Sequence, residues 1–371
     1  MDPVTLRVPT LYGPGHYQTE ALETFGEAVE EASGGVLEFE FYYQDSLVAP
    51  ADTVGALSDG IVDLSLIVPG YNPSDFPIDQ WTSEFTFLGD PEPVVGLLQS
   101  SAAALDWAFD QDDQMAEYEE LGLVPLIPRF AGHDTYNLLC KSPITDLASA
   151  QGERGRSGAP NWSAEMESVG MVPVSLAGGE IYEGFQRGIL DCHVGSGPDM
   201  ADLGLWEVGK HYTSANFSGW SSGGLMMSET TWDSLPLAAQ QILWDNAISY
   251  VVAWKQGWIE AMHRFVVEGK EMGLEFHEPE SDFATALDEH KAEVLDTAAD
   301  AAPSTVQDPE ATVTAFEEAH AVWLPVVADE LGYSTGSRTW EDWAESNGPE
   351  VDLSDWADDV EREILAPRRP E

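Results

Sequence analysis

Apolar residues follow two different periods along the first 70 positions. Segments around Leu6–Val8 and over Leu37–Tyr43 alternate apolar and polar residues, the two-residue period of a strand. Between them, apolar side chains recur at helical spacing from Tyr17 until a pair of glycines ends the pattern. A short helix over 53–58 and an apolar strand over 62–68 follow. This β-α-β-α-β order predicts a parallel sheet with helices on both faces.

A second series of short strands and helices begins near residue 125, after a helical pattern over 90–116. Its expected strands are 123–129, 136–140, 155–157, 172–175 and 189–194. Its expected helices are 145–151, 162–169 and 181–187. Three long helical patterns follow over 236–271, 280–298 and 309–331. From about Ser334 the sequence is polar but contains three tryptophans, which predicts short helices packed on the body.

Two such series followed by returning helices predict an α/β protein of two lobes, joined by crossover strands and a long helix. We expect one lobe to comprise 1–127 and about 216–250. The other is expected to comprise 128–215 and about 251–333, with 334–371 as a C-terminal polar extension. Ligands of such folds bind in the cleft at the carboxyl ends of the strands.

Charge narrows the classes of partner. The 371 residues include 67 acidic and 15 basic side chains, for a formal net charge of −52. A chain this acidic repels nucleic acid and anionic membranes, because both are bound through Lys and Arg. An acidic surface poor in lysine is typical of halophilic proteins, where salt screens the self-repulsion; a generally acidic secreted protein is the alternative. The N-terminal segment MDPVTLRVPT has no secretory pattern, so we expect either a cytosolic protein or a mature sequence.

The common catalytic and metal-binding motifs have little support in the sequence. Gly219–Gly223 matches the G-x-S-x-G nucleophile elbow around Ser221, but an apolar strand-like run follows it instead of a helix. The histidines are scattered without close pairs at metal-ligand spacing. No glycine pattern for dinucleotides or phosphates is present, so we expect no cofactor.

Several motifs occur in the order found in one family of binding proteins. They are GPGHY, GG-V-L-E-F, the segment from Leu57 to Asp63, KSPITDL (141–147), GERGR (152–156), EIYEGFQRGILD (180–191) and WDSLP (232–236). On these motifs the chain resembles TRAP-transporter solute-binding proteins of the DctP type, from about residue 5 to residue 333. The resemblance implies a periplasmic-binding-protein-like fold, type II-like, and an extracytoplasmic or periplasmic location. It also implies a monomer that delivers a small organic anion to TRAP membrane subunits without catalysis.

In that family, the arginine on the strand after the D-L-x-x-x-x-G segment binds the ligand carboxylate. The matching residue here is Arg156, with Arg154 expected to be its exposed neighbour. A guanidinium suits this role because it stays charged and offers a planar, bidentate fork. The alternative is a structural ion pair, since acids are abundant in this chain.

The sequence departs from better-known members at two places. Tyr136 replaces the second arginine of sialic-acid binders. Val194 and Gly195 replace the glutamate and tryptophan that keto-acid binders carry, where the glutamate helps to hold a metal. We therefore expect neither a sialic acid nor a bound metal, and His193 and Ser196 are the polar groups available instead.

Other cleft candidates lie in the loops that follow strands. They are His16, Tyr17, Tyr71, Asn161, Trp162, Phe217 and Trp220. Ordinary core packing is the alternative for each aromatic residue. An aromatic box of Tyr71, Tyr136, Trp162, Phe217 and Trp220 favours a ligand with one carboxylate and an apolar or ring-shaped body.

Cys140 and Cys192 each end a strand expected in the second lobe. If those strands are neighbours, the two cysteines are placed to form a disulfide, which suits an oxidising compartment; two buried thiols are the alternative. The sequence thus predicts a TRAP-type solute-binding protein. A serine-type hydrolase using Ser221 and a sensor-associated binding protein remain the alternatives.

Overall fold

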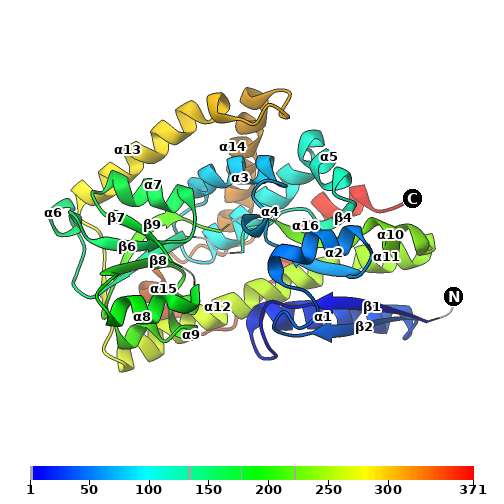
Figure 1. Ribbon diagram of the computed structural model, residues 1–371, viewed down its shortest axis with the longest axis horizontal. Helices are drawn as coiled ribbons and strands as arrows, with labels where there is room; N and C mark the ends of the chain where they lie inside the picture. The colour runs from blue at the N-terminus through cyan, green and yellow to red at the C-terminus, as the bar shows by residue number, and fades with distance from the viewer. Residues whose placement is uncertain (1–2, 133–134, 177, 221–222) are drawn as a thin grey trace.

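The computed structural model describes residues 3–132, 135–176, 178–220 and 223–371. It places two groups of strands side by side, each covered by helices, with the long helix α12 (Ala247–Glu271) running in the lower half of the view from the group at left toward the group at right (Figure 1). The predicted α/β two-lobe class is confirmed. No helix in the described part of the chain is long and apolar enough to cross a membrane.

The first lobe contains two small sheets. Strands β1 (Val4–Pro9) and β2 (Leu37–Tyr42) pair in parallel, as the β-α-β order predicts. Strand β3 (Leu64–Ile67) instead pairs antiparallel with β10 (Gly224–Ser228), and β10 also pairs antiparallel with β4 (Leu123–Ile127). The prediction of one parallel sheet was therefore wrong here, because a strand returning from the other lobe lies between β3 and β4.

Helix α1 (Tyr17–Ser33) matches the predicted periodicity and positions the first loop of the cleft. It begins after His16, whose Nδ1 accepts a hydrogen bond from the Gln18 amide, and it ends at Gly34, whose φ of 64° favours glycine. A Cβ added at Gly257 would lie 2.8 Å from the Cβ of Tyr17. Glycine at this position therefore lets α12 approach the start of α1 closely.

The second lobe is built on a six-stranded mixed sheet. The strand order is β11 (Glu275–His277), β9 (His211–Ser218), β5 (Thr135–Cys140), β8 (Cys192–Gly195), β6 (Arg154–Ser157) and β7 (Val172–Ser175). Strand β5 is antiparallel to both of its neighbours, whereas β8, β6 and β7 are parallel to one another. The start of β5 therefore lies at the same end of the strands as the carboxyl ends of β6 and β8.

Cys140 and Cys192 face each other across β5 and β8 and form a disulfide. The predicted bridge is confirmed. It joins β5 and β8 at the end of the sheet opposite the carboxyl ends of β6 and β8. The two cysteines have a sequence separation of 52 residues. Both cysteines are fully buried.

Most of the remaining helices follow the predicted patterns, with two interruptions, whereas the helices over 77–82, 197–202 and 229–234 were not predicted. They are α2 (Thr53–Ser58), α3 (Pro77–Thr82), α4 (Val95–Phe109), α5 (Asp112–Glu120), α6 (Leu147–Ala150), α7 (Pro160–Ser168), α8 (Ile181–Gln186), α9 (Gly197–Asp202), α10 (Glu229–Ser234), α11 (Leu237–Asp245), α13 (Ser281–Thr297), α14 (Pro309–Pro325), α15 (Trp340–Ser346) and α16 (Ser354–Val360). The pattern over 90–116 breaks between α4 and α5, and the pattern over 236–271 divides at Asn246. Periodicity alone did not predict either break.

The C-terminal segment packs on the rest of the protein through its tryptophans. Trp340, Trp343 and Trp356 are buried in the same apolar cluster as α1 and α12. The indole N–H of Trp244 on α11 also donates to the carbonyl of Leu365. Burial of three large rings explains why a polar segment carries them.

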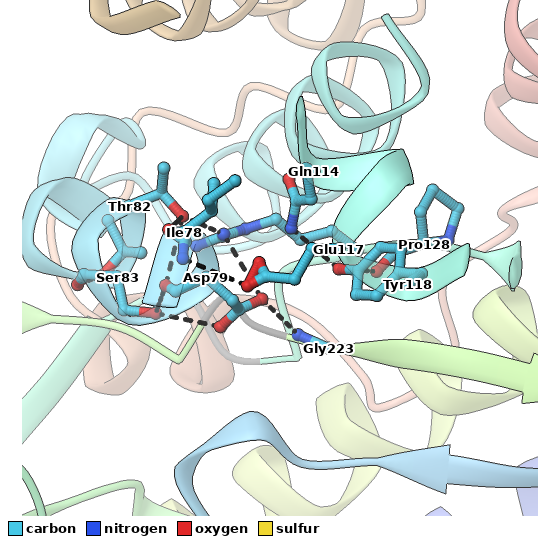
Figure 2. Close-up of polar contacts among 11 residues, drawn as sticks. Ile78, Asp79, Thr82, Ser83, Gln114, Glu117, Tyr118, Pro128 and Gly223 are labelled. Carbon is cyan, nitrogen blue, oxygen red and sulfur yellow. Dashed lines mark hydrogen bonds and ion pairs between the residues drawn. The ribbon is translucent and has the colours of Figure 1, made fainter. Parts of the chain in front are cut away.

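A buried polar cluster fixes the first-lobe ends of two connections between the lobes (Figure 2). Asp79 on α3 accepts a hydrogen bond from the amide of Gly223, which precedes β10, at 3.1 Å. The Asp79 carboxylate also lies 3.5 Å from Nη1 of Arg129, which follows β4, and both side chains are fully buried. The Arg129 guanidinium donates to the Thr82 hydroxyl as well. Asp79 thus joins α3 to the segment that follows β4 and to the segment that precedes β10.

Glu117 on α5 borders this cluster and makes stability depend on pH. Its Oε1 accepts a hydrogen bond from the Ile78 amide, while its buried Oε2 has no hydrogen-bond partner among the described residues. Burial raises the pKa of Glu117 from 4.5 to about 8, with a smaller contribution from Asp79. Because the unfolded chain releases this proton at a lower pH, the free energy of unfolding should fall as pH rises from about 4.5 to about 8.

We expect Glu117→Gln to remove this fall, because glutamine is neutral throughout. The variant should gain stability over wild type as pH rises. Above pH 8 the gain should level off at roughly 2 kcal/mol, about half of the ~5 kcal/mol that the pKa shift would give without solvent screening. Urea unfolding from pH 4 to pH 9 measures the difference. Glu120→Gln, which changes an exposed carboxylate on the same helix, should show no such trend, and parallel curves for wild type and Glu117→Gln would contradict the assignment.

Candidate functional site

A cleft of about 1200 Å³ lies between the lobes. One side comes from the loop before α1 together with Gln44 and Tyr71, and the other from the ends of β6 and β8 with the start of α9. Helix α12 lines the cleft around Gly257–Arg264, and the C-terminal extension contributes Pro349 and Glu350. The predicted residues in its lining are His16, Tyr17, Tyr71, Tyr136, Arg156, Trp162 and His193.

Arg156 lies near the end of β6 and faces the cleft. Its Nε donates to the carbonyl of Leu176 at 3.1 Å, which holds the guanidinium plane. A Cβ at Gly158 would come within 2.8 Å of the Arg156 Nη1, so glycine leaves room for the side chain. Burial lowers the pKa of Arg156, while the groups at Tyr136 and Asp199 oppose this shift. The guanidinium is therefore oriented, partly desolvated and still cationic.

No carboxylate lies within ion-pair distance of Arg156 in the described part of the chain. Its neighbour Arg154, two residues earlier on β6, forms a bidentate pair with Asp191 through two 2.8 Å contacts. With 67 acidic residues for 15 basic ones, an arginine without such a partner is unusual. The predicted alternative, a structural ion pair, is not what the structure shows at Arg156.

His193 lies beside Arg156 on the same face of the sheet, because the two residues are register partners on β8 and β6. Only 3% of His193 is exposed, and its Nδ1 has no hydrogen-bond partner among the described residues. Burial, followed by the charge of Arg156, lowers the pKa of His193 to about 3. The ring is therefore neutral at physiological pH and offers a hydrogen-bonding group next to the guanidinium.

Tyr136 and Trp162 form an aromatic wall next to Arg156. Their rings stack with centroids 4.7 Å apart, and the Trp162 indole donates to the Ser218 carbonyl, which fixes its orientation. Trp162 and Tyr71 also line an adjoining cavity of about 260 Å³. Asn161 and Trp220 border this second cavity and not the main cleft.

His16 forms the opposite wall in a stack of three rings. Its imidazole lies 3.7 Å from the ring of Tyr12 and 4.7 Å from that of Tyr17. Burial lowers the pKa of His16 to about 4, so the ring is neutral. Since Nδ1 accepts from the Gln18 amide, Nε2 carries the proton and points toward Asp202, 3.6 Å away on α9. This contact crosses from one lobe to the other.

Asp199 is a cleft residue that the sequence analysis missed. It lies in the first turn of α9 and lines the cleft with Arg156. Burial raises the pKa of Asp199 to about 6, while the Ser196 hydroxyl and the charge of Arg156 oppose this shift. The cleft therefore presents an acceptor near its cation. The spacing Ser196-x-x-Asp199 is a capping-box pattern, a signal that could have placed Asp199 at a helix start.

Two further predicted residues, Phe217 and Ser196, do not line the cleft. Phe217 is fully buried and packs edge-on against Phe283, because its position on β9 turns the ring toward α13. Ser196 is also buried, and its hydroxyl accepts from the Asp199 amide as the cap of α9. The predicted aromatic box of five residues is thus reduced to Tyr71, Tyr136 and Trp162 in the main cleft. Ser221, the alternative nucleophile, lies outside the described residues.

Residues 10–301 match the family described as bacterial extracellular solute-binding protein, family 7, or DctP. The chain belongs to this family. A solute-binding protein of Sulfitobacter sp. (strain NAS-14.1) is 24% identical over 241 residues, which cover 64% of this chain and 70% of the relative. The predicted resemblance is confirmed, and DctP proteins are binding proteins of TRAP transporters rather than enzymes.

Solved structures of TRAP solute-binding proteins share the fold. One from Desulfovibrio salexigens superposes with a TM-score of 0.73 at 20% identity, covering 86% of this chain and 96% of the other. Another, from Bordetella bronchiseptica with bound (R)- and (S)-mandelate, gives a TM-score of 0.71 at 21% identity, covering 86% and 99%. At this level of identity the likeness establishes the fold and not the ligand.

Proposed function

We propose that this DctP protein acts outside the cytoplasm and captures a small organic acid for TRAP membrane subunits, as a monomer and without chemistry. The ligand carboxylate pairs with Arg156, and closure of the lobes encloses it. The observation that carries the proposal is a cleft arginine with no carboxylate partner among the described residues, in a chain of net charge −52. A ligand carboxylate would supply the pairing that no described residue of the protein provides.

The division into lobes at 127/128 and 215/216 is part of this proposal. A third junction of this division lies near residue 250, where α12 is continuous, so this helix would bend or pivot as one element during closure. The contact between His16 and Asp202 already bridges the lobes at one side of the cleft. Closure around a ligand would bring further groups of the two walls together.

The cleft also supports a class of ligand. The stacked pair Tyr136 and Trp162 suits an apolar or ring-shaped body. Asp199 is an acceptor, so it suits a hydroxyl or N–H on the same molecule. Mandelate, bound by the solved relative from Bordetella bronchiseptica, combines a carboxylate, a hydroxyl and a ring. We infer a ring-bearing or branched hydroxy acid, or a comparable acid with an N–H donor.

A thermal-shift screen of mono- and dicarboxylates, followed by calorimetry, tests the proposed function. One acid or a small set should raise the Tm at micromolar to millimolar concentration, and mass spectrometry should recover it unchanged after incubation. Conversion of the acid, or hydrolysis of an ester, would support the hydrolase alternative instead. No stabilisation by any organic acid would contradict the proposed ligand class.

Asp199→Ala tests the donor requirement at pH 8, where the Asp199 carboxylate is ionised. A hydroxy acid should bind wild type about ten-fold or more tightly than its deoxy analogue, since hydrogen bonds to charged groups contribute ~1.5–3 kcal/mol. The variant should reduce this ratio toward one, with mandelate and phenylacetate as the first pair. Glu20→Ala, which removes an exposed carboxylate from the cleft rim, should leave the ratio unchanged. An unchanged ratio in Asp199→Ala would sink the assignment.

A further inference from the structure

His211, Glu275 and His277 form a cluster at the far end of the second-lobe sheet from the cleft. Strands β9 and β11 pair in parallel, with His211 opposite Glu275. His277 is two residues after Glu275, so all three side chains project from the same face of the sheet. The cleft is lined by the carboxyl ends of β6 and β8. His211 begins β9 opposite Cys140, at the other end of the strands.

The distances within the cluster match metal coordination. Nδ1 of His211 lies 3.1 Å from Nε2 of His277 and 3.5 Å from Oε2 of Glu275. One ligand atom from each residue lies within 4.8 Å of the others. Ligand atoms around a tetrahedral zinc ion with bonds of ~2.0–2.1 Å are separated by about 3.3 Å. A metal between these three atoms thus needs only small side-chain adjustments.

We propose that these three residues bind one divalent transition-metal ion, of which Zn²⁺ is the best match. Two imidazoles and one carboxylate form a borderline donor set that favours zinc over calcium or magnesium, whose ligands are oxygens. The net charge of −52 raises the local concentration of cations. Three protein ligands leave a fourth position for water or for another side chain.

The surroundings support a neutral imidazole at His277, the form that coordinates metal. Burial, followed by the charge of His211, lowers the pKa of His277, while Glu275 and Glu341 oppose this shift. Without a metal, one of the two facing ring nitrogens must carry a proton to form their hydrogen bond. Metal binding would replace this hydrogen bond with two coordinate bonds.

The position of the cluster suggests what the metal does. Strand β11 is the edge strand of the sheet and follows four residues after the end of α12. Lys270, in the last turn of α12, pairs with Glu341 on α15 at 2.7 Å. A metal joining β9 to β11 would therefore stabilise the place where α12 and the C-terminal extension meet the second lobe, without touching the ligand cleft.

Calorimetric titration of the full chain with Zn²⁺, in the presence of excess Mg²⁺ and about 1 M NaCl, tests this site. Mg²⁺ occupies oxygen-only sites among the many carboxylates, and the salt screens diffuse attraction. Wild type should bind one zinc equivalent at micromolar concentration, and the Tm should rise by several degrees and fall again on chelation. No zinc binding under these conditions would overturn the proposal.

Three variants and a control locate the ion. His211→Ala and His277→Ala should each weaken zinc binding about 30-fold or more, while Glu275→Gln, which changes a largely exposed side chain and should fold normally, should weaken it several-fold. His290→Ala, on α13 and outside the cluster, should bind as wild type does. Zinc binding that persists in His277→Ala and Glu275→Gln would place the ion elsewhere and contradict the proposal.

Discussion

Arg156→Ala is expected to weaken binding of the organic acid by about 100- to 1000-fold. Truncating one partner of a desolvated, hydrogen-bonded charge pair lowers the binding free energy by ~2–5 kcal/mol. Each 1.4 kcal/mol corresponds to about a ten-fold change in Kd. The Tm of the ligand-free protein should hold or rise slightly, because Arg156 has no carboxylate partner to lose in the described structure. Calorimetry with the acid from the screen measures the affinity, and differential scanning fluorimetry measures the Tm.

Matched arginine variants separate this role from a general effect of charge. Arg156→Lys keeps the charge but loses the planar fork, so its affinity should lie between those of wild type and Arg156→Ala. Arg154→Ala breaks the pair with Asp191 on the same strand and should bind the acid normally. Arg264 lines the cleft 3.7 Å from Asp202, and Arg264→Ala should cost at most a few-fold. If Arg264→Ala lost more affinity than Arg156→Ala, the wrong arginine has been assigned.

Asp79→Asn is expected to destabilise the protein by about 3–5 kcal/mol, because it leaves the fully buried Arg129 without its carboxylate. Asparagine can still accept the hydrogen bond from the Gly223 amide, so the substitution mainly removes charge. Thermal unfolding should show a Tm lowered by roughly 4–6 °C.

The double variant Asp79→Asn with Arg129→Met tests whether the loss arises from the pair. It should be less destabilised than the sum of the two single variants, because it leaves no unpaired buried charge. Asp75→Asn, at an exposed aspartate just before α3, is the control and should change the Tm little. Additive losses in the double variant would mean that Asp79 and Arg129 act separately.

Local structure followed from the sequence more closely than sheet pairing did. Helices α1 and α2 and strand β7 have the predicted bounds to within a residue or two, because periodicity and glycine stops act over a few neighbouring positions. The insertion of β10 between β3 and β4 depends on contacts between residues about 100 or more positions apart. No local pattern in the GLMMS segment specifies such partners.

The candidate site shows the same division. Arg156 was predicted from its motif, and the structure adds that no carboxylate pairs with it among the described residues. Phe217 and Ser196 were misplaced because strand facing and helix capping decide where those side chains point. Asp199 was missed because the turn into α9 places it in the wall of the same cleft as Arg156.

The His211, Glu275 and His277 cluster was also invisible in the sequence. The two histidines are 66 positions apart, and only the parallel pairing of β9 with β11 makes them neighbours. The sequence analysis predicted no bound metal, both because Val194 and Gly195 replace the residues that would hold one in the cleft and because the histidines are scattered along the chain. The proposed zinc site lies at the end of the same sheet that is farther from the cleft.

A crystal structure with the acid identified by the screen tests the central claim most directly. The account predicts the ligand carboxylate at about 2.8 Å from the Arg156 guanidinium, with the body of the ligand against Tyr136 and Trp162. A carboxylate held by Arg264, or a ligand bound outside the cleft with Arg156 still without a carboxylate partner, would contradict it.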